Sequence, residues 1–173
     1  EALATPAPVQ ADACYSAQPM QLCSVRTADC LPVLLCDRDG GEVAAVHAGW
    51  RGLAGGVVES ALERFQAPPA TVLAWLGPAI SQLNFEVGSE VRDAFADAVS
   101  QRDRAATLAC FRAEADKYRA DLYALARLRL HAMGVQQVFG GQYCTYGEPQ
   151  RFHSYRRDGT SAGRLYSVII RCD

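Results

Sequence analysis

Two apolar runs separated by a glycine-containing turn form the clearest hydrophobic pattern in the chain. Leu31 to Cys36 is apolar throughout, and Val43 to Val46 is a second apolar run. The intervening segment Arg38-Asp39-Gly40-Gly41 has the composition of a tight turn. The pattern therefore predicts a buried β-hairpin with these two runs as its antiparallel strands.

Alternating and helically spaced apolar residues predict the remaining elements. Strands are expected at Leu22–Arg26, Thr71–Leu76, Val135–Phe139 and Leu165–Arg171, and helices at Ala54–Phe65, Ser89–Val99 and Lys117–Met133. Three arginines of the last helix, Arg119, Arg127 and Arg129, are expected on its solvated side. The alternation, without repeat or linker, predicts one mixed α/β domain over residues 1–173.

The predicted hairpin brings one cysteine and one histidine to the same edge of the sheet. Cys30 directly precedes the first strand, and His47 ends the second. A thiolate and an imidazole placed together can bind zinc or form a nucleophile and base pair. Cysteine is also a frequent core residue, so the pattern alone leaves a structural role open. Asp29 is expected to orient His47 or a ligand, or else to cap a turn.

Two further segments have the composition of a binding site for a phosphorylated or aromatic ligand. Backbone N–H groups at the start of the helix after His47 can receive an anion, and Arg51 lies beside them. Farther along, Tyr155 and Arg156 lie in the segment Phe152 to Asp158. Aromatic rings stack on purines, and guanidinium groups hold phosphate or ribose oxygens. A surface turn held by an Arg–Asp pair is the alternative for this segment.

Composition narrows the possible partners and the compartment. A net charge of −2 does not indicate a basic surface of the kind that binds nucleic acid. No apolar run reaches the roughly 20 residues of a membrane span. Seven cysteines without CxxC spacing are typical of free thiols in a reducing cytoplasm. Residues 1–10, rich in alanine and proline, are expected to be extended or disordered.

Four motifs in order resemble those of one protein family. They are TADCLPVLL with HAGWRG around the hairpin, GPAI with FEVG at Gly77 to Gly88, CTY at Cys144 to Tyr146, and FHSYRRDG at Phe152 to Gly159. The chain thereby resembles the YfiH-like family, long called multicopper polyphenol oxidase or laccase-domain and now described as purine nucleoside phosphorylase. The resemblance implies a single-domain layered α/β/β/α fold and a metal held by Cys30 and His47.

The chain departs from the family pattern at one metal ligand. The resemblance implies a third histidine upstream, in a Gln-x-His-Gly-like motif, but no histidine precedes His47 here. We therefore expect that ligand, with the N-terminal part of the family domain, to lie upstream of Glu1. His131 and His153 are not expected to replace it. Cys144 is expected to be a buried strand thiol near the site.

Three classes of function remain open from the sequence. The resemblance implies zinc-dependent phosphorolysis of adenosine, inosine or methylthioadenosine, with adenosine deamination as a side activity and phosphate as a second substrate. The first alternative is a cysteine hydrolase or amidase with a Cys30–His47 dyad, acting in peptidoglycan precursor editing. The second is a copper phenol oxidase, for which copper would replace zinc. A laccase needs many histidines, and the chain has three.

Overall fold

The computed structural model describes residues 11–172, so the expectation for residues 1–10 lies outside the described part. The strands are β1 (Ala13–Ser16), β2 (Leu22–Thr27), β3 (Leu31–Asp37), β4 (Val43–Ala48), β5 (Val72–Leu76), β6 (Glu86–Val87), β7 (Phe111–Glu114), β8 (Lys117–Ala120), β9 (Gln137–Gly140) and β10 (Leu165–Ile170). The helices are α1 (Trp50–Ala54), α2 (Val57–Leu62), α3 (Ser89–Asp97), α4 (Gln101–Ala109), α5 (Leu122–Ala132) and α6 (Tyr155–Asp158), with 3-10 turns at Pro69–Thr71 and Gly159–Ser161.

The main sheet is built around the predicted hairpin. Its strand order is β1-β4-β3-β5-β9, and β9 lies parallel to β5 while the other neighbours are antiparallel. The hairpin prediction is confirmed as β3 and β4, with Val33 opposite Val46 in the register. Leu31, Val33 and Leu35 of the central strand β3 are fully buried in the larger hydrophobic core.

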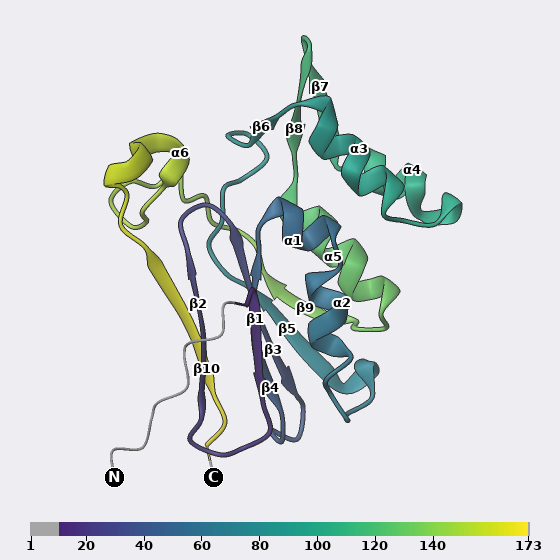
Figure 1. Ribbon diagram of the computed structural model, residues 1–173, viewed down its shortest axis with the longest axis vertical. Helices are drawn as coiled ribbons and strands as arrows, with labels where there is room; N and C mark the ends of the chain where they lie inside the picture. The colour runs from purple at the N-terminus through teal and green to yellow at the C-terminus, as the bar shows by residue number, and fades with distance from the viewer. Residues whose placement is uncertain (1–10, 173) are drawn as a thin grey trace, which may run out of the picture.

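Both faces of the hairpin are covered, which explains why its apolar runs are continuous rather than alternating. Val33 and Leu35 belong to the larger core, which also contains the buried residues of α1, α2 and α5. Leu34 and Cys36 pack on the opposite face against a second cluster that includes Cys23 of β2. Figure 1 shows the helices α1, α2 and α5 on one side of the main sheet and β2 with β10 on the other. The expected mixed α/β architecture is confirmed.

A second sheet consists of β2 and β10, which pair antiparallel from Leu22 opposite Ile170 to Thr27 opposite Leu165. Both strands were predicted from their alternation, and both are confirmed. The inward side chains Cys23 and Val25 are buried against the main sheet. The outward side chains of this sheet are large and apolar yet exposed: Leu22, Tyr166, Val168 and Ile170.

The single helix predicted at Ala54–Phe65 is interrupted, so that prediction is only partly right. The first helix, α1, already begins at Trp50, and the chain breaks at Gly55 and Gly56 before α2. Gly56 adopts φ +88°, a left-handed conformation that side-chain-bearing residues rarely take. The glycine pair therefore ends one short helix and starts the next.

The helix predicted at Lys117–Met133 is wrong over its first four residues. Residues Lys117–Ala120 form β8, which pairs with β7 and β6 in a small three-stranded sheet. The helix proper begins after Asp121, whose carboxylate accepts a hydrogen bond from Ala124 N at 2.9 Å. A tight hairpin with β7 and pairing with the more distant β6 overrode the local helical pattern here, and neither α4 nor β7 was predicted.

Two of the arginines expected on the solvated side of this helix are instead structural. Arg127 donates to the carbonyls of Val138 and Gly140 at 2.8 and 2.7 Å. Arg129 pairs with Glu59 at 3.1 Å and donates to the carbonyl of Ala54. These bonds fix α5 to β9 and to α1 and α2. Within residues 11–172, no helix combines the length and apolar character needed to cross a membrane.

Candidate functional site

The β3–β4 hairpin brings Cys30 and His47 to the same end of the main sheet. His47 lies opposite Pro32, and Ala48 lies opposite Leu31, so Cys30 is the next residue beyond the paired end of β3. Both residues are partly buried, with 32% of the His47 side chain exposed. The antiparallel register therefore places a thiol and an imidazole together at the point where the sheet ends.

Gly49 marks the space that these two side chains share. A Cβ atom at Gly49 would lie 3.1 Å from Cys30 Sγ and 3.6 Å from His47 Nε2. The backbone of Gly49, with φ −64° and ψ 159°, is one that any residue can adopt. The lack of a side chain at this position therefore matters for space rather than for backbone conformation. The sulfur and the nitrogen both border one small volume beside Gly49.

Asp12 contacts His47 from the opposite side of the imidazole ring. His47 Nδ1 lies 2.9 Å from Asp12 Oδ1, and the backbone N–H of His47 donates to the carbonyl of Asp12 at 2.7 Å. The hydrogen bond with Cys30 raises the pKa of His47 to about 9, against the opposing effect of burial and with further help from Asp12. Asp12 was not predicted as a site residue, because the short strand β1 that positions it has little hydrophobic signal.

Two roles were expected for Asp29, orienting His47 or a ligand and capping a turn, and its hydrogen bonds in the structure correspond to capping. Its buried carboxylate accepts hydrogen bonds from Thr145 Oγ1 at 2.6 Å, from Ser154 Oγ at 3.0 Å and from Arg156 N at 2.6 Å. Ser154 is the N-cap of α6, so Asp29 caps the start of that helix from a distant part of the chain. The carboxylate that contacts the His47 ring is that of Asp12 rather than that of Asp29.

The three residues predicted to bind substrate have separate environments. The Arg51 guanidinium is exposed and lies 4.3 Å from the centre of the Trp50 ring. Arg156 donates to the carbonyl of Glu86 at 3.0 Å, and Tyr155 is 52% exposed. None of the hydrogen bonds or ion pairs among residues 11–172 joins these side chains to Cys30 or His47. Their predicted role in binding remains a proposal.

Cys144 does not lie in a regular strand but in a loop rich in hydrogen-bond donors. Its sulfur accepts hydrogen bonds from Ser81 Oγ at 3.0 Å, from Asn84 Nδ2 at 3.2 Å and from Gly147 N at 3.3 Å. Burial alone would raise the pKa of this thiol, but the donors outweigh it and hold the pKa below its usual value. The expectation of an ordinary buried strand thiol is therefore wrong.

Of the metal ligands that the sequence predicts, Cys30 and His47 lie within the described residues. No group of three or more His, Cys, Asp or Glu side chains within residues 11–172 is arranged to hold a metal ion. His131 is exposed on α5, and His153 packs against Gly163 in the fourth motif. Among the described residues, neither histidine belongs to a group of three or more candidate ligands with Cys30 and His47.

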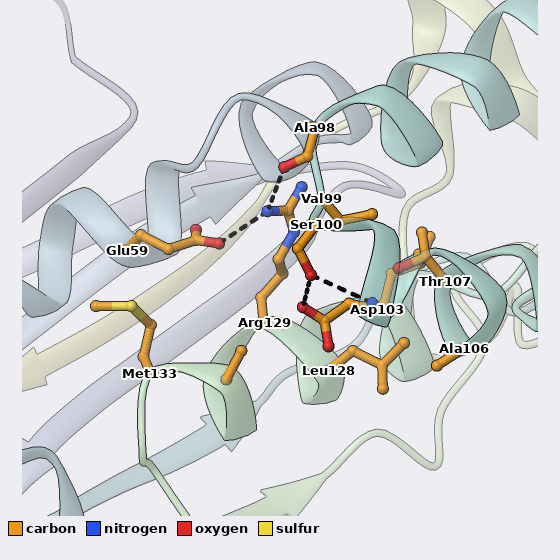
Figure 2. Close-up of a pocket in the computed structure, with 12 residues that line it drawn as sticks. Glu59, Ala98, Val99, Ser100, Asp103, Ala106, Thr107, Leu128, Arg129 and Met133 are labelled. Carbon is orange, nitrogen blue, oxygen red and sulfur yellow. Dashed lines mark hydrogen bonds and ion pairs between the residues drawn. The ribbon is translucent and has the colours of Figure 1, made fainter.

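A separate cavity of about 200 Å³ lies between α2, α4 and α5 and is shown in Figure 2. Arg129 crosses it, paired with Glu59 and bonded to the carbonyl of Ala98, while Ser100 caps α4 through Asp103. The remaining lining is mainly apolar and includes Leu128 and Met133. Its lining contains none of the predicted site residues, and its polar groups mainly bond to one another and to the backbone.

Comparisons with known proteins identify the family. A family model described as multi-copper polyphenol oxidoreductase laccase matches residues 2–172. The chain belongs to this family. It is 56% identical over 160 residues to the protein named purine nucleoside phosphorylase YfiH of Escherichia coli strain K12, a match that covers 92% of this chain and 63% of that protein.

Two further members extend the comparison. The protein named adenosine deaminase RL5, from an unknown prokaryotic organism, is 38% identical over 152 residues, covering 85% of this chain and 57% of that protein. The crystal structure of NMB0706 from Neisseria meningitidis matches with a TM-score of 0.88 and 49% identity, over 94% of this chain and 65% of that chain. The chain thus spans less than two thirds of the length of these family members.

Proposed function

We propose that the protein is a metal-dependent purine nucleoside phosphorylase acting on adenosine, inosine and methylthioadenosine, with adenosine deamination as a side activity. The observation that carries the proposal is the convergence of Cys30 Sγ and His47 Nε2 on the space beside Gly49. The names of the relatives, phosphorylase for one and adenosine deaminase for another, support the choice of substrate class. The free cysteines also suit a cytoplasmic enzyme.

The residues present fit a zinc ion. Cys30 and His47 would hold it, since thiolate sulfur and imidazole nitrogen are the preferred zinc ligands and bond at about 2.0–2.3 Å. The missing side chain of Gly49 leaves room for an ion in contact with both atoms. When bound, zinc supplies a positive charge that polarises a substrate oxygen or lowers the pKa of a water molecule. Copper at this position is possible chemically, but three histidines do not make a set of laccase centres.

Phosphorolysis requires a phosphate oxygen to attack ribose C1′ while the bond from C1′ to the purine nitrogen breaks. The purine leaves with the electron pair of that bond and takes up a proton. Arg51 would hold the phosphate, because its exposed guanidinium has no carboxylate partner within the described residues and carries five N–H donors. Tyr155 offers an exposed ring for stacking on the purine, and Arg156 would bind ribose or phosphate oxygens.

One observation supports the cysteine hydrolase as a second candidate. Cys30, His47 and Asp12 occur in the order nucleophile, base and orienting carboxylate, the arrangement found in hydrolytic triads. In such an enzyme the Cys30 sulfur would attack the carbonyl carbon of an amide, and His47 would pass the thiol proton to the leaving amine. An amide of a peptidoglycan precursor is the substrate class that this alternative implies.

Metal removal separates the two candidates. For the phosphorylase, chelation should abolish release of the purine base from adenosine in the presence of phosphate, and added zinc should restore it. For the hydrolase, chelation should leave the amide hydrolysis unchanged. A thiol-alkylating reagent should then modify Cys30 before the other six cysteines. Undiminished release of the purine base by metal-free protein, together with selective alkylation of Cys30, would contradict the proposed metal-dependent function.

A further inference from the structure

Asp12 is bound to His47 through both its main chain and its side chain. The carbonyl of Asp12 accepts the backbone N–H of His47 at 2.7 Å, and its carboxylate lies 2.9 Å from His47 Nδ1. The two residues are 35 positions apart in the sequence. The backbone hydrogen bond holds Asp12 beside His47, so its short side chain is long enough to reach the imidazole ring.

The pairing of β1 with β4 explains this placement. Ala13 lies opposite Val46 in the antiparallel register, and Asp12 is therefore the residue next to His47. β1 is one of the two edge strands of the main sheet, and 61% of the Asp12 side chain is exposed. The contact is thus held by strand pairing, while the carboxylate itself has little packing to lose.

We infer that Asp12 is a positioning residue that aims His47 Nε2 at the metal site; this inference rests on the proposed function. A carboxylate can only accept hydrogen bonds, so the Nδ1 atom of His47 carries the hydrogen of this contact. In the neutral ring, which is the form that binds a metal ion, the other nitrogen, Nε2, keeps its lone pair, and it faces the space beside Gly49. Carboxylates behind a metal-bound histidine fix the tautomer and orientation of the ring in this way.

The competing carboxylate near the site does not fill this role. Asp29 adjoins Cys30, but its two oxygens are bonded to Thr145, Ser154 and Arg156. Within the described part of the chain, the carboxylate that contacts the His47 ring belongs to Asp12. Replacing Asp12 should therefore lower the zinc affinity, whereas replacing Asp29 should lower the free energy of unfolding.

The test is the zinc affinity of the purified protein, measured by competition with a chromophoric chelator. Replacing Asp12→Ala should weaken zinc binding by about 10- to 100-fold, the usual effect of removing such a carboxylate. The zinc affinity of Asp12→Asn should lie between those of wild type and Asp12→Ala, because its amide oxygen still accepts the hydrogen bond from Nδ1 but carries no charge. Asp39→Ala is the matched control, since Asp39 is an exposed aspartate in the turn at the other end of the same hairpin.

A structural role is separated by measuring unfolding alongside. Asp12→Ala and Asp39→Ala should unfold at similar urea concentrations, with the affinity loss confined to Asp12. Equal zinc affinity in wild-type protein, Asp12→Ala and Asp12→Asn would overturn the inference and leave the proposed function standing. Failure of the wild-type protein to bind zinc at all would overturn both. If Asp12→Ala does not fold, unchanged affinity in Asp12→Asn overturns the inference, and a severalfold loss in that variant supports it.

Discussion

Ser154 Oγ donates a hydrogen bond to the Asp29 carboxylate at 3.0 Å across 125 residues of sequence. Asp29 immediately precedes Cys30, and Ser154 caps α6 in the fourth motif. The two stretches of the sequence that carry candidate chemistry are therefore joined by one buried carboxylate. The backbone of Asp29 has φ +85°, a left-handed conformation that Asp and Asn tolerate better than most residues.

Replacing Asp29→Ala should destabilise the fold by about 3 kcal/mol, because charge-assisted bonds are lost and buried donors remain unpaired. Asp29→Asn should cost less, since it keeps an acceptor oxygen and tolerates the left-handed backbone. Urea unfolding of the two variants checks the order. An Asp29→Ala variant within 0.5 kcal/mol of wild type, roughly the range of ordinary surface substitutions, would contradict this role.

Replacing Gly49→Ala should remove metal binding while leaving the fold intact. The added Cβ would lie 3.1 Å from Cys30 Sγ and 3.6 Å from His47 Nε2, in the space proposed for the ion. The backbone angles at Gly49 accept alanine without strain. Zinc content of the purified variant, measured by elemental analysis, gives the answer.

Gly52→Ala is the matched control for this variant, since its Cβ would make only ordinary contacts, at 3.5 Å with the carbonyl oxygen of His47 and at 3.5 Å with Val57 Cγ1. Gly52 lies in α1, three residues after Gly49. The Gly52→Ala variant should retain one zinc ion per chain. Normal zinc content in Gly49→Ala would mean that the ion does not occupy this space.

Tyr123 provides a test of the loops that carry the second and third motifs. Its hydroxyl accepts from Ala79 N at 2.8 Å and lies 3.1 and 2.9 Å from the carbonyls of Gly77 and Tyr143. Tyr123→Phe should therefore cost about 2 kcal/mol, because the buried Ala79 N–H loses its partner. Tyr166→Phe, at an exposed position of β10, should leave the free energy of unfolding unchanged. Equal stability of the two variants would show that the Tyr123 hydroxyl does not anchor these loops.

The same tyrosine predicts a dependence of stability on alkaline pH. Burial raises the pKa of Tyr123 from 10.0 to about 12 in the folded protein. Since the unfolded chain releases this proton first, the stability linked to it is complete below pH 10.0 and is lost as pH rises toward about 12. The stability advantage of wild type over Tyr123→Phe should shrink across that range in urea titrations. A constant difference would contradict the shifted pKa.

The sequence predicted the hairpin and the meeting of Cys30 with His47, because both depend on contacts between residues close in the chain. It did not predict Asp12, whose position depends on β1, a four-residue edge strand with little hydrophobic signal. Nor did it predict the partners of Asp29, which lie 116 to 127 residues away. Residues Lys117–Ala120 were misassigned for a different reason: they form a local hairpin with β7 and also pair with β6, although their spacing of apolar residues continues into the helix that follows.

The central claim is that Cys30 and His47 hold a metal used in phosphorolysis of purine nucleosides. The most direct test is phosphate-dependent release of hypoxanthine from inosine by wild-type protein and by Cys30→Ala, each metal-stripped and then supplied with zinc. We expect wild-type protein to release hypoxanthine only when zinc is supplied. Cys30→Ala should release none with or without zinc, although its cooperative unfolding in urea should show that it is folded. Undiminished hypoxanthine release by metal-stripped wild-type protein and by Cys30→Ala would contradict the claim.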